Sequence, residues 1–130
     1  MNRYDARESA FALVFSLDFS DDADIGELLT LYCESESVER DAFFESLVRA
    51  VADHKNDIDH AIEGKLAHWS LARLSKITLA VLRLGTAELL YFDETPNAVV
   101  INEAVEIAKK YEGKESGRFV NGILSAIAEQ

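Results

Sequence analysis

Apolar residues recur at three- and four-residue intervals from the N-terminus onward, which is the period of an amphipathic helix. In the first such segment the apolar stripe consists of Ala6, Ala10, Leu13, Val14 and Leu17. The polar run Ser20-Asp21-Asp22 then interrupts the pattern. The spacing therefore predicts a first helix from roughly Arg3 to Phe19.

The same periodicity predicts three more helices before Trp69. Asp24 is placed to cap the second helix, because its side chain can accept from the free N–H groups of a first turn. Ser37 is placed to cap the third helix in the same way. The periodicity continues to Leu66, with a break near Asn56 that starts a fourth helix. The inward-facing residues are Ile25, Leu28, Leu29, Tyr32, Phe43, Phe44, Leu47, Val48, Val51, Ile58, Ala61, Ile62 and Leu66.

Three helices are predicted after Trp69. The segment from Lys76 to Tyr91 is apolar nearly all round, which indicates a buried central helix. Thr95 and Pro96 form an N-cap and first-turn pair for a sixth helix, which Gly113 ends. Its inward face is Ile101, Ala104, Ala108 and Tyr111. Ser116 or Gly117 opens the last helix, with Val120, Leu124 and Ile127 inward.

These helices predict an all-α fold, a compact bundle of about seven helices formed by one domain over residues 1–130. Apolar residues make up 48% of the chain, which suits a packed core and excludes a disordered protein. Arg83 and Glu88 interrupt the most apolar stretch, so no membrane span is expected. Cys33 is the only cysteine, and no apolar signal core follows Met1. We therefore expect a soluble cytoplasmic protein.

The charge is strongly acidic and unevenly distributed. The net charge is −11, of which residues 1–65 contribute −10. Binding to nucleic acid normally depends on neutralising phosphates, so overall acidity argues against it. The acidic residues are concentrated between Asp18 and Glu63, however, and two short basic patches lie outside that interval.

The sequence contains no recognisable catalytic constellation. It has no phosphate-binding Gly-rich loop and no nucleophile motif. His54, His60 and His68 do not converge on one point of a helix, so no metal site is expected. We therefore predict a protein without catalysis and without a cofactor.

The first basic patch is Arg3 and Arg7. Residues four apart share a helix face, and two guanidinium groups one turn apart can contact two phosphates. Tyr4 could add stacking on a base. The alternative is that this segment is a solvated helix start, and Asp5 and Glu8 weaken the patch.

The second basic patch precedes and enters the last helix. It consists of Lys109, Lys110, Lys114, Ser116, Gly117 and Arg118. Free N–H groups and the dipole at a helix N-terminus attract phosphate. The lysines would strengthen that attraction, whereas Glu112 and Glu115 weaken it. Phe119 either packs inside or stacks on a base. Asn121 either caps a neighbouring backbone group or contacts a base edge.

Several short segments of the sequence resemble those of a known family. They are Ala6-Arg7-Glu8-Ser9-Ala10, Ala80-Val81-Leu82-Arg83, Glu88-Leu89-Leu90, the segment from Ile101 to Lys109, and the segment from Phe119 to Leu124. In their order and spacing they resemble the NusB family of bacterial transcription antitermination factors, over nearly the whole chain.

The resemblance implies a function. NusB-like proteins pair with a ribosomal protein called NusE and bind the boxA RNA of ribosomal RNA leaders. With other Nus factors they act on RNA polymerase, so that transcription passes terminators. By resemblance, the residues around Arg118, Phe119 and Asn121 contact RNA.

The resemblance also implies a partner surface on the first helix and at the start of the central helix. Phe15 matches an aromatic position of the family. Thr78 and Leu79 replace a common acidic–basic pair, which leaves three interpretations open. They are a more apolar partner surface, a homodimer formed through an exposed Leu79, and a Leu79 that belongs to the core. A module of the same fold without RNA binding is the alternative function.

Overall fold

A computed structural model describes residues 1–19, 22, 24–68 and 70–129 of the chain. Its regular structure is entirely helical over these residues. The elements are α1 (Arg3–Leu17), α2 (Ile25–Ser35), α3 (Ala42–Asp53), α4 (Lys55–Glu63), the short 3-10 helix η1 (Leu71–Arg73), α5 (Lys76–Tyr91), α6 (Asn97–Glu112) and α7 (Lys114–Ala128). The predicted all-α bundle of about seven helices is confirmed. Trp69 and the residues Ser20 and Asp21 of the predicted break lie outside the described residues.

Side-chain caps fix the starts of the first three helices. The carboxylate of Asp24 accepts from the backbone N–H of Glu27 at 3.0 Å, as predicted. The prediction that Ser37 caps the third helix is wrong. Ser37 lies in a turn with a φ of 55°, and Asp41 caps α3 by accepting from the N–H of Phe44 at 2.9 Å. An aspartate next to the apolar run supplies the cap more directly than a serine five positions before α3.

The periodicity of α3 and α4 is interrupted at His54, close to the predicted break near Asn56. The His54 ring stacks on the ring of Tyr91 at a centroid distance of 4.0 Å. This contact joins the α3–α4 corner to the end of α5.

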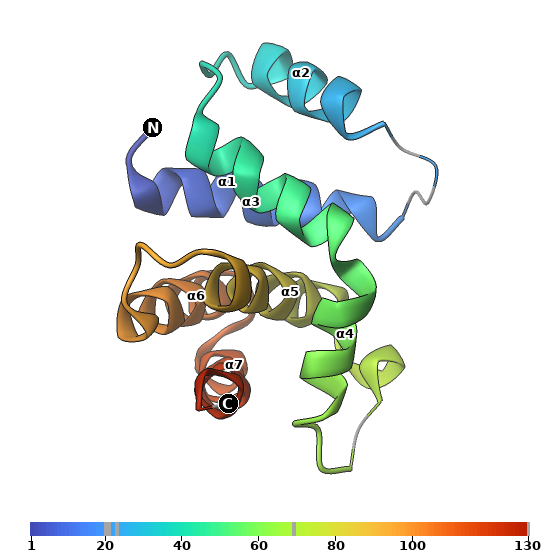
Figure 1. Ribbon diagram of the computed structural model, residues 1–130, viewed down its shortest axis with the longest axis vertical. Coiled ribbons are helices and arrows are strands. Elements are labelled where there is room, and N and C mark those ends of the chain that lie inside the picture. The colour runs from blue at the N-terminus through green and yellow to red at the C-terminus, as the bar shows by residue number, and fades with distance from the viewer. Residues whose placement is uncertain (20–21, 23, 69, 130) are drawn as a thin grey trace.

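Helix α5 is the centre of the molecule. It begins and ends where the sequence predicts, and every residue from Thr78 to Glu88 is buried. It packs against α1, α3, α4, α6 and α7, and Figure 1 shows it beside α6, with α1 and α3 on one side of this layer and α7 on the other. A Cβ atom at Gly85 would lie 2.7 Å from a methyl carbon of Leu124, so glycine allows α7 to approach closely.

Helices α6 and α7 pack closely against each other. Helix α6 begins at Asn97 with Pro96 at its N-cap position, one residue later than the predicted Thr95 cap. Gly113 ends α6, as predicted, and is the only residue between the two helices. Its φ of 91° lies in the region that favours glycine, which lets the chain reverse in one residue. Helix α7 therefore begins at Lys114, before the predicted Ser116 or Gly117.

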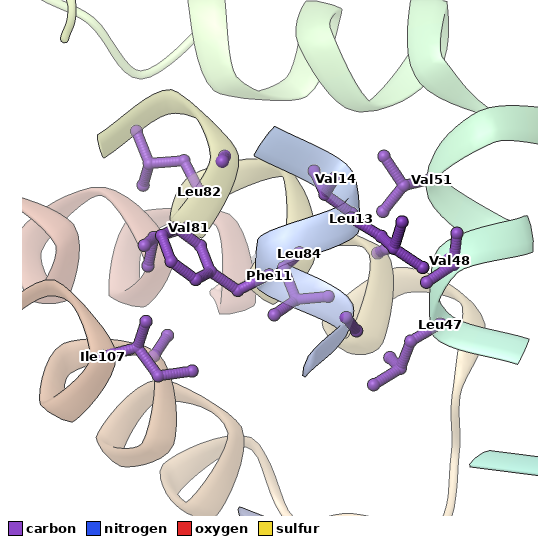
Figure 2. Packing of buried hydrophobic residues seen from close by; sticks show 14 of the residues in the cluster. Phe11, Leu13, Val14, Leu47, Val48, Val51, Val81, Leu82, Leu84 and Ile107 are labelled. Atoms are coloured by element: carbon purple, nitrogen blue, oxygen red, sulfur yellow. The ribbon is translucent and has the colours of Figure 1, made fainter. Parts of the chain in front are cut away.

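The core lies where α1 meets α3, α5 and α6. Figure 2 shows Phe11, Leu13 and Val14 of α1 between the apolar residues of α3 and those of α5. Phe11 also contacts the ring of Tyr111 at a centroid distance of 5.0 Å. Tyr111 itself is 44% exposed, so the prediction that it faces inward is wrong. Its hydroxyl needs a polar partner, which lies at the surface.

Two buried charges of α5 are paired, because an unpaired charge in the interior is costly. The guanidinium of Arg83 donates to both carboxylate oxygens of Asp59, at 2.8 and 3.0 Å, and to Asp18 at 2.9 Å. Glu88 is paired with Arg7 of α1. Within the described part of the chain, no helix has the length and apolar character that a membrane crossing requires.

Candidate nucleic-acid interface

A shallow groove of ≈ 310 Å³ lies between α6 and α7. It is lined by Val105, Lys109, Lys114, Gly117, Arg118 and Asn121. Helix α6 supplies the first two of these residues from its C-terminal half, and the first two turns of α7 supply the others. The reversal at Gly113 therefore brings together four residues of the second basic patch.

Gly117 determines how closely the two helices meet along this groove. A Cβ atom at that position would lie 2.6 Å from Cγ of Lys109 and 3.4 Å from a methyl carbon of Val105. The missing side chain lets the aliphatic stem of Lys109 lie across α7. The ammonium group of Lys109 is then held beside the first turns of α7.

The cations of the groove differ in how far they are neutralised. Lys109 forms an exposed ion pair with Glu106 at 3.4 Å. Lys114 and Arg118 are exposed, and neither forms a salt bridge with any described residue. They lie in the first turns of α7, where the helix dipole also favours an anion. The arrangement is chemically suited to a phosphate group.

Lys110 lies on a different face of α6 and does not line the groove. Its ammonium group donates to Oε2 of Glu8 at 2.6 Å, and the hydroxyl of Tyr111 donates to the same oxygen at 3.0 Å. The hydrogen bond to Glu8 raises the pKa of Lys110. The pKa of the Tyr111 hydroxyl is raised by burial and then by this hydrogen bond. Lys110 therefore ties α6 to α1, and Glu8 offsets its charge.

The two N-terminal arginines do not share an exposed face, so that prediction is wrong. Arg7 is only 4% exposed, and it donates to both oxygens of Glu88 at 2.8 and 2.7 Å. The hydrogen bond to Glu88 raises the pKa of Arg7. Glu103 adds a longer contact at 3.8 Å. Arg7 lies in the interior because Glu88, on a buried helix, needs a cation there.

Arg3 remains at the surface. Its guanidinium carbon lies 3.9 Å from the centroid of the Phe43 ring, a cation–π arrangement. This places Arg3 beside α3 and leaves it as the exposed arginine of the first patch. Its role in binding RNA stays a prediction.

The residues expected to bind a partner also separate into exposed and buried groups. Phe15 is partly buried and lies between the rings of Phe11 and Phe19, at centroid distances of 6.4 and 5.2 Å. Phe19 is 65% exposed, so this aromatic row ends at the surface. Thr78 and Leu79 are only 7% and 4% exposed. The interpretation in which an exposed Leu79 forms a homodimer is therefore wrong, and Leu79 belongs to the buried apolar residues.

Phe119 and Asn121 take different positions on α7. Phe119 is partly buried and packs against the core, which favours packing over stacking on a base. Asn121 is exposed and lines the groove. The sequence indicated Glu8 and Glu112 only as charges that weaken the two basic patches, and Tyr111 only as an inward-facing residue. It did not indicate that Glu8 and Tyr111 hold Lys110, or that Glu112 binds the hydroxyls of α5. The four- and three-residue intervals between Glu8, Phe11 and Phe15 were a signal that Glu8 borders the face of α1 that meets α6.

Comparison with known proteins agrees with this architecture. The NusB family model matches residues 4–129. A transcription antitermination protein NusB from Lysinibacillus sphaericus is 42% identical over 130 residues, covering 100% of this chain and 99% of that protein.

Two solved structures have similar folds. The structure of T. maritima NusB superposes with a TM-score of 0.87 at 37% identity, covering 100% of this chain and 92% of that one. The crystal structure of the antitermination factors NusB and NusE in complex with double-stranded RNA gives a TM-score of 0.87 at 33% identity, covering 99% and 98%. The chain therefore belongs to the NusB family.

Proposed function

We propose that this protein is a transcription antitermination factor that binds boxA RNA of ribosomal RNA leaders together with NusE. The observation that carries the proposal is the α6–α7 groove, where Lys114 and Arg118 are exposed and without acidic partners among the described residues. Lys109 and Asn121 add a third cation and an amide that can contact a base edge. We assign it no catalysis and expect it in the cytoplasm as one helical domain.

The similar structure of NusB with NusE and double-stranded RNA supports an RNA-binding role for a chain of this fold. The overall acidity does not oppose it. The acidic residues concentrate between Asp18 and Glu63, whereas the groove lies on α6 and α7. The Debye length is about 8 Å at physiological salt, so charges on a distant face are largely screened.

The partner surface that we propose for NusE is the aromatic row on α1. Phe15 is partly buried and Phe19 is exposed, so both present apolar area that a partner can cover. Binding NusE would add a second RNA-contacting surface to the same complex, which raises the effective concentration of the RNA at the groove. Other Nus factors and RNA polymerase would join that complex.

One observation favours the alternative function, a protein-interaction module without RNA binding. Arg7 is buried and Lys110 is paired with Glu8. Fewer cations are therefore available to bind RNA than the sequence predicts. RNA binding by this protein alone should therefore be weak and should have a shallow salt dependence.

Fluorescence anisotropy of a labelled boxA RNA, with a scrambled RNA as control, tests the proposal. The titration is run with and without NusE, at low and at near-physiological salt. We expect selective binding that tightens when NusE is present. Equal binding to both RNAs, with NusE present and shown to pair, would favour the interaction module.

A further inference from the structure

A hydrogen-bonded cluster joins the start of α5 to the junction of α6 and α7. It consists of Ser75, Thr78, Glu112 and Ser116. The hydroxyls of Ser75 and Thr78 both donate to Oε1 of Glu112, the latter at 2.8 Å. The Thr78 hydroxyl also lies 2.9 Å from that of Ser116, in the first turn of α7.

The cluster is anchored on the buried central helix α5. Thr78 is only 7% exposed, and its backbone N–H donates to the Ser75 side chain at 3.0 Å, which caps α5. Glu112 and Ser116, in contrast, lie on either side of Gly113. The residues on both sides of Gly113, the link between α6 and α7, are thus hydrogen-bonded to the buried helix α5.

The cluster also determines where the Glu112 carboxylate lies. This carboxylate is two residues from Lys114, and a carboxylate facing the groove would repel phosphate. The hydroxyls of α5 hold it on the side of the turn that faces α5. They therefore orient the first turn of α7 and keep a negative charge away from the cations.

We propose that Thr78 and Ser116 are positioning residues for RNA binding: through Glu112 they hold the first turn of α7 so that Lys114 and Arg118 present their charges together. This inference rests on the proposed function. It gives Thr78, which the sequence suggested as a partner contact, a different role. Because Thr78 is buried, it acts on the RNA through the turn and does not touch the RNA itself.

The test compares Thr78→Val with Thr86→Val. Both substitutions remove a buried hydroxyl from α5 and keep the side-chain volume, but the Thr86 hydroxyl has no hydrogen-bond partner among the described residues. We expect Thr78→Val to weaken RNA binding by about three- to tenfold, the size of one or two lost hydrogen bonds. Thr86→Val should bind as the original protein does, and Thr78→Ser, which keeps the hydroxyl, should restore binding.

A second pair gives an independent readout if Thr78→Val folds poorly. Ser116→Ala removes the far end of the cluster, and Ser125→Ala removes a hydroxyl from the same helix outside it. We expect only Ser116→Ala to weaken RNA binding. Hydrogen exchange at the Gly117 and Arg118 amides should also be faster in Thr78→Val than in Thr86→Val, with or without RNA.

A double-mutant cycle separates positioning from general destabilisation. In a Lys114→Ala/Arg118→Ala background, Thr78→Val should cause little further loss of RNA affinity, because the groups that it positions are gone. The inference is overturned if folded Thr78→Val binds RNA as tightly as Thr86→Val, or if it costs the same factor in both backgrounds. Failure of the unmodified protein to bind boxA RNA with NusE would instead overturn the proposed function.

Discussion

The two basic regions of this protein contain the same kinds of residue, but the fold buries one cation of the first region and leaves the cations of the second exposed. At the N-terminus, Arg7 enters the interior and neutralises Glu88. At the α6–α7 turn, Lys114 and Arg118 stay at the surface with no acidic partner among the described residues. The difference arises from what each helix packs against, since the core-facing side of α1 meets a buried carboxylate of α5.

A basic residue is available to bind a ligand only if it is exposed and not already paired with a carboxylate of the same protein. Lys110 illustrates the intermediate case, because it is exposed but paired with Glu8. Availability therefore decreases from Lys114 and Arg118, through Lys110, to Arg7.

The largest effect is expected at the buried pair. Glu88→Ala leaves the guanidinium of Arg7 buried, with a long contact to Glu103 and the ring of Phe43 as its remaining neighbours. It should lower the free energy of unfolding by about 3–5 kcal/mol. Chemical denaturation measures this loss. Glu63→Ala, which removes an exposed carboxylate from α4, should change the free energy of unfolding by less than about 0.5 kcal/mol. Equal losses of stability in Glu88→Ala and Glu63→Ala would mean that the Arg7–Glu88 pair does not stabilise the fold.

The second largest effect is a loss of RNA affinity, with the free energy of unfolding nearly unchanged. Lys114→Ala together with Arg118→Ala should weaken RNA binding and reduce the slope of log K against log salt by about 0.7 per lost phosphate contact on single-stranded RNA. Arg49→Ala with Lys55→Ala removes the same charge from exposed positions on α3 and α4. If this control pair weakens binding as much, the groove is not the binding site.

A third, smaller effect is the acid dependence of stability at Asp18. The ammonium group of Lys76, 2.8 Å from Oδ2, and the hydrogen bond from Arg83 lower the pKa of Asp18 below its ordinary value of 3.8. A carboxylate whose pKa is lower in the folded state stabilises the protein above the unfolded-state pKa, and that stabilisation is lost as the pH falls through the folded-state pKa. Asp18→Asn should remove this part of the acid dependence in denaturation at a series of pH values. An unchanged acid profile would contradict the assignment.

The smallest expected effect is an increase in RNA affinity. Glu8→Gln keeps an acceptor for Tyr111 but removes the charge that offsets Lys110. RNA affinity should rise by about two- to fivefold if Lys110 contacts RNA, because an exposed ion pair is worth only about 0.2–1 kcal/mol. Glu63→Gln is the control, since it removes a similar charge from an exposed position on α4. No difference between the two variants would remove Lys110 from the proposed interface.

Much of the fold could be predicted because local signals agree with packing. The bounds of α5 follow from a continuous apolar run, and the cap of α2 follows from a single suitable aspartate. The start of α3 was missed because Ser37 and Asp41 can both cap a helix, and packing decides between them. The start of α7 was missed because the periodicity does not show that Gly113 reverses the chain alone.

The candidate site was harder to predict. Arg3 and Arg7 are four residues apart, which the sequence analysis took as one face. Four residues turn a helix by 400°, so the two side chains differ by 40° in direction. Direction does not separate them, because at 100° per residue Arg3 lies within 60° of both Ala6 and Ala10, which are buried. Arg3 is the first residue of α1 and lies at the end of the helix, whereas Arg7 lies one turn further in, among the buried residues. The partner that decides the matter, Glu88, lies 81 residues away in sequence, and no local pattern connects it to Arg7.

The single-residue link at Gly113 has a consequence for how the groove responds to disturbance. The distance between Lys109 and Lys114 across the reversal is set largely by covalent geometry, because no loop of variable length separates the two helices. A longer loop can change conformation or accept an insertion while the helices stay intact. This junction cannot change in either way without unwinding a helix end. The backbone separation of these two residues should therefore change little until α6 or α7 itself unwinds, and the α5 cluster then has only the orientation of the first turn of α7 left to determine.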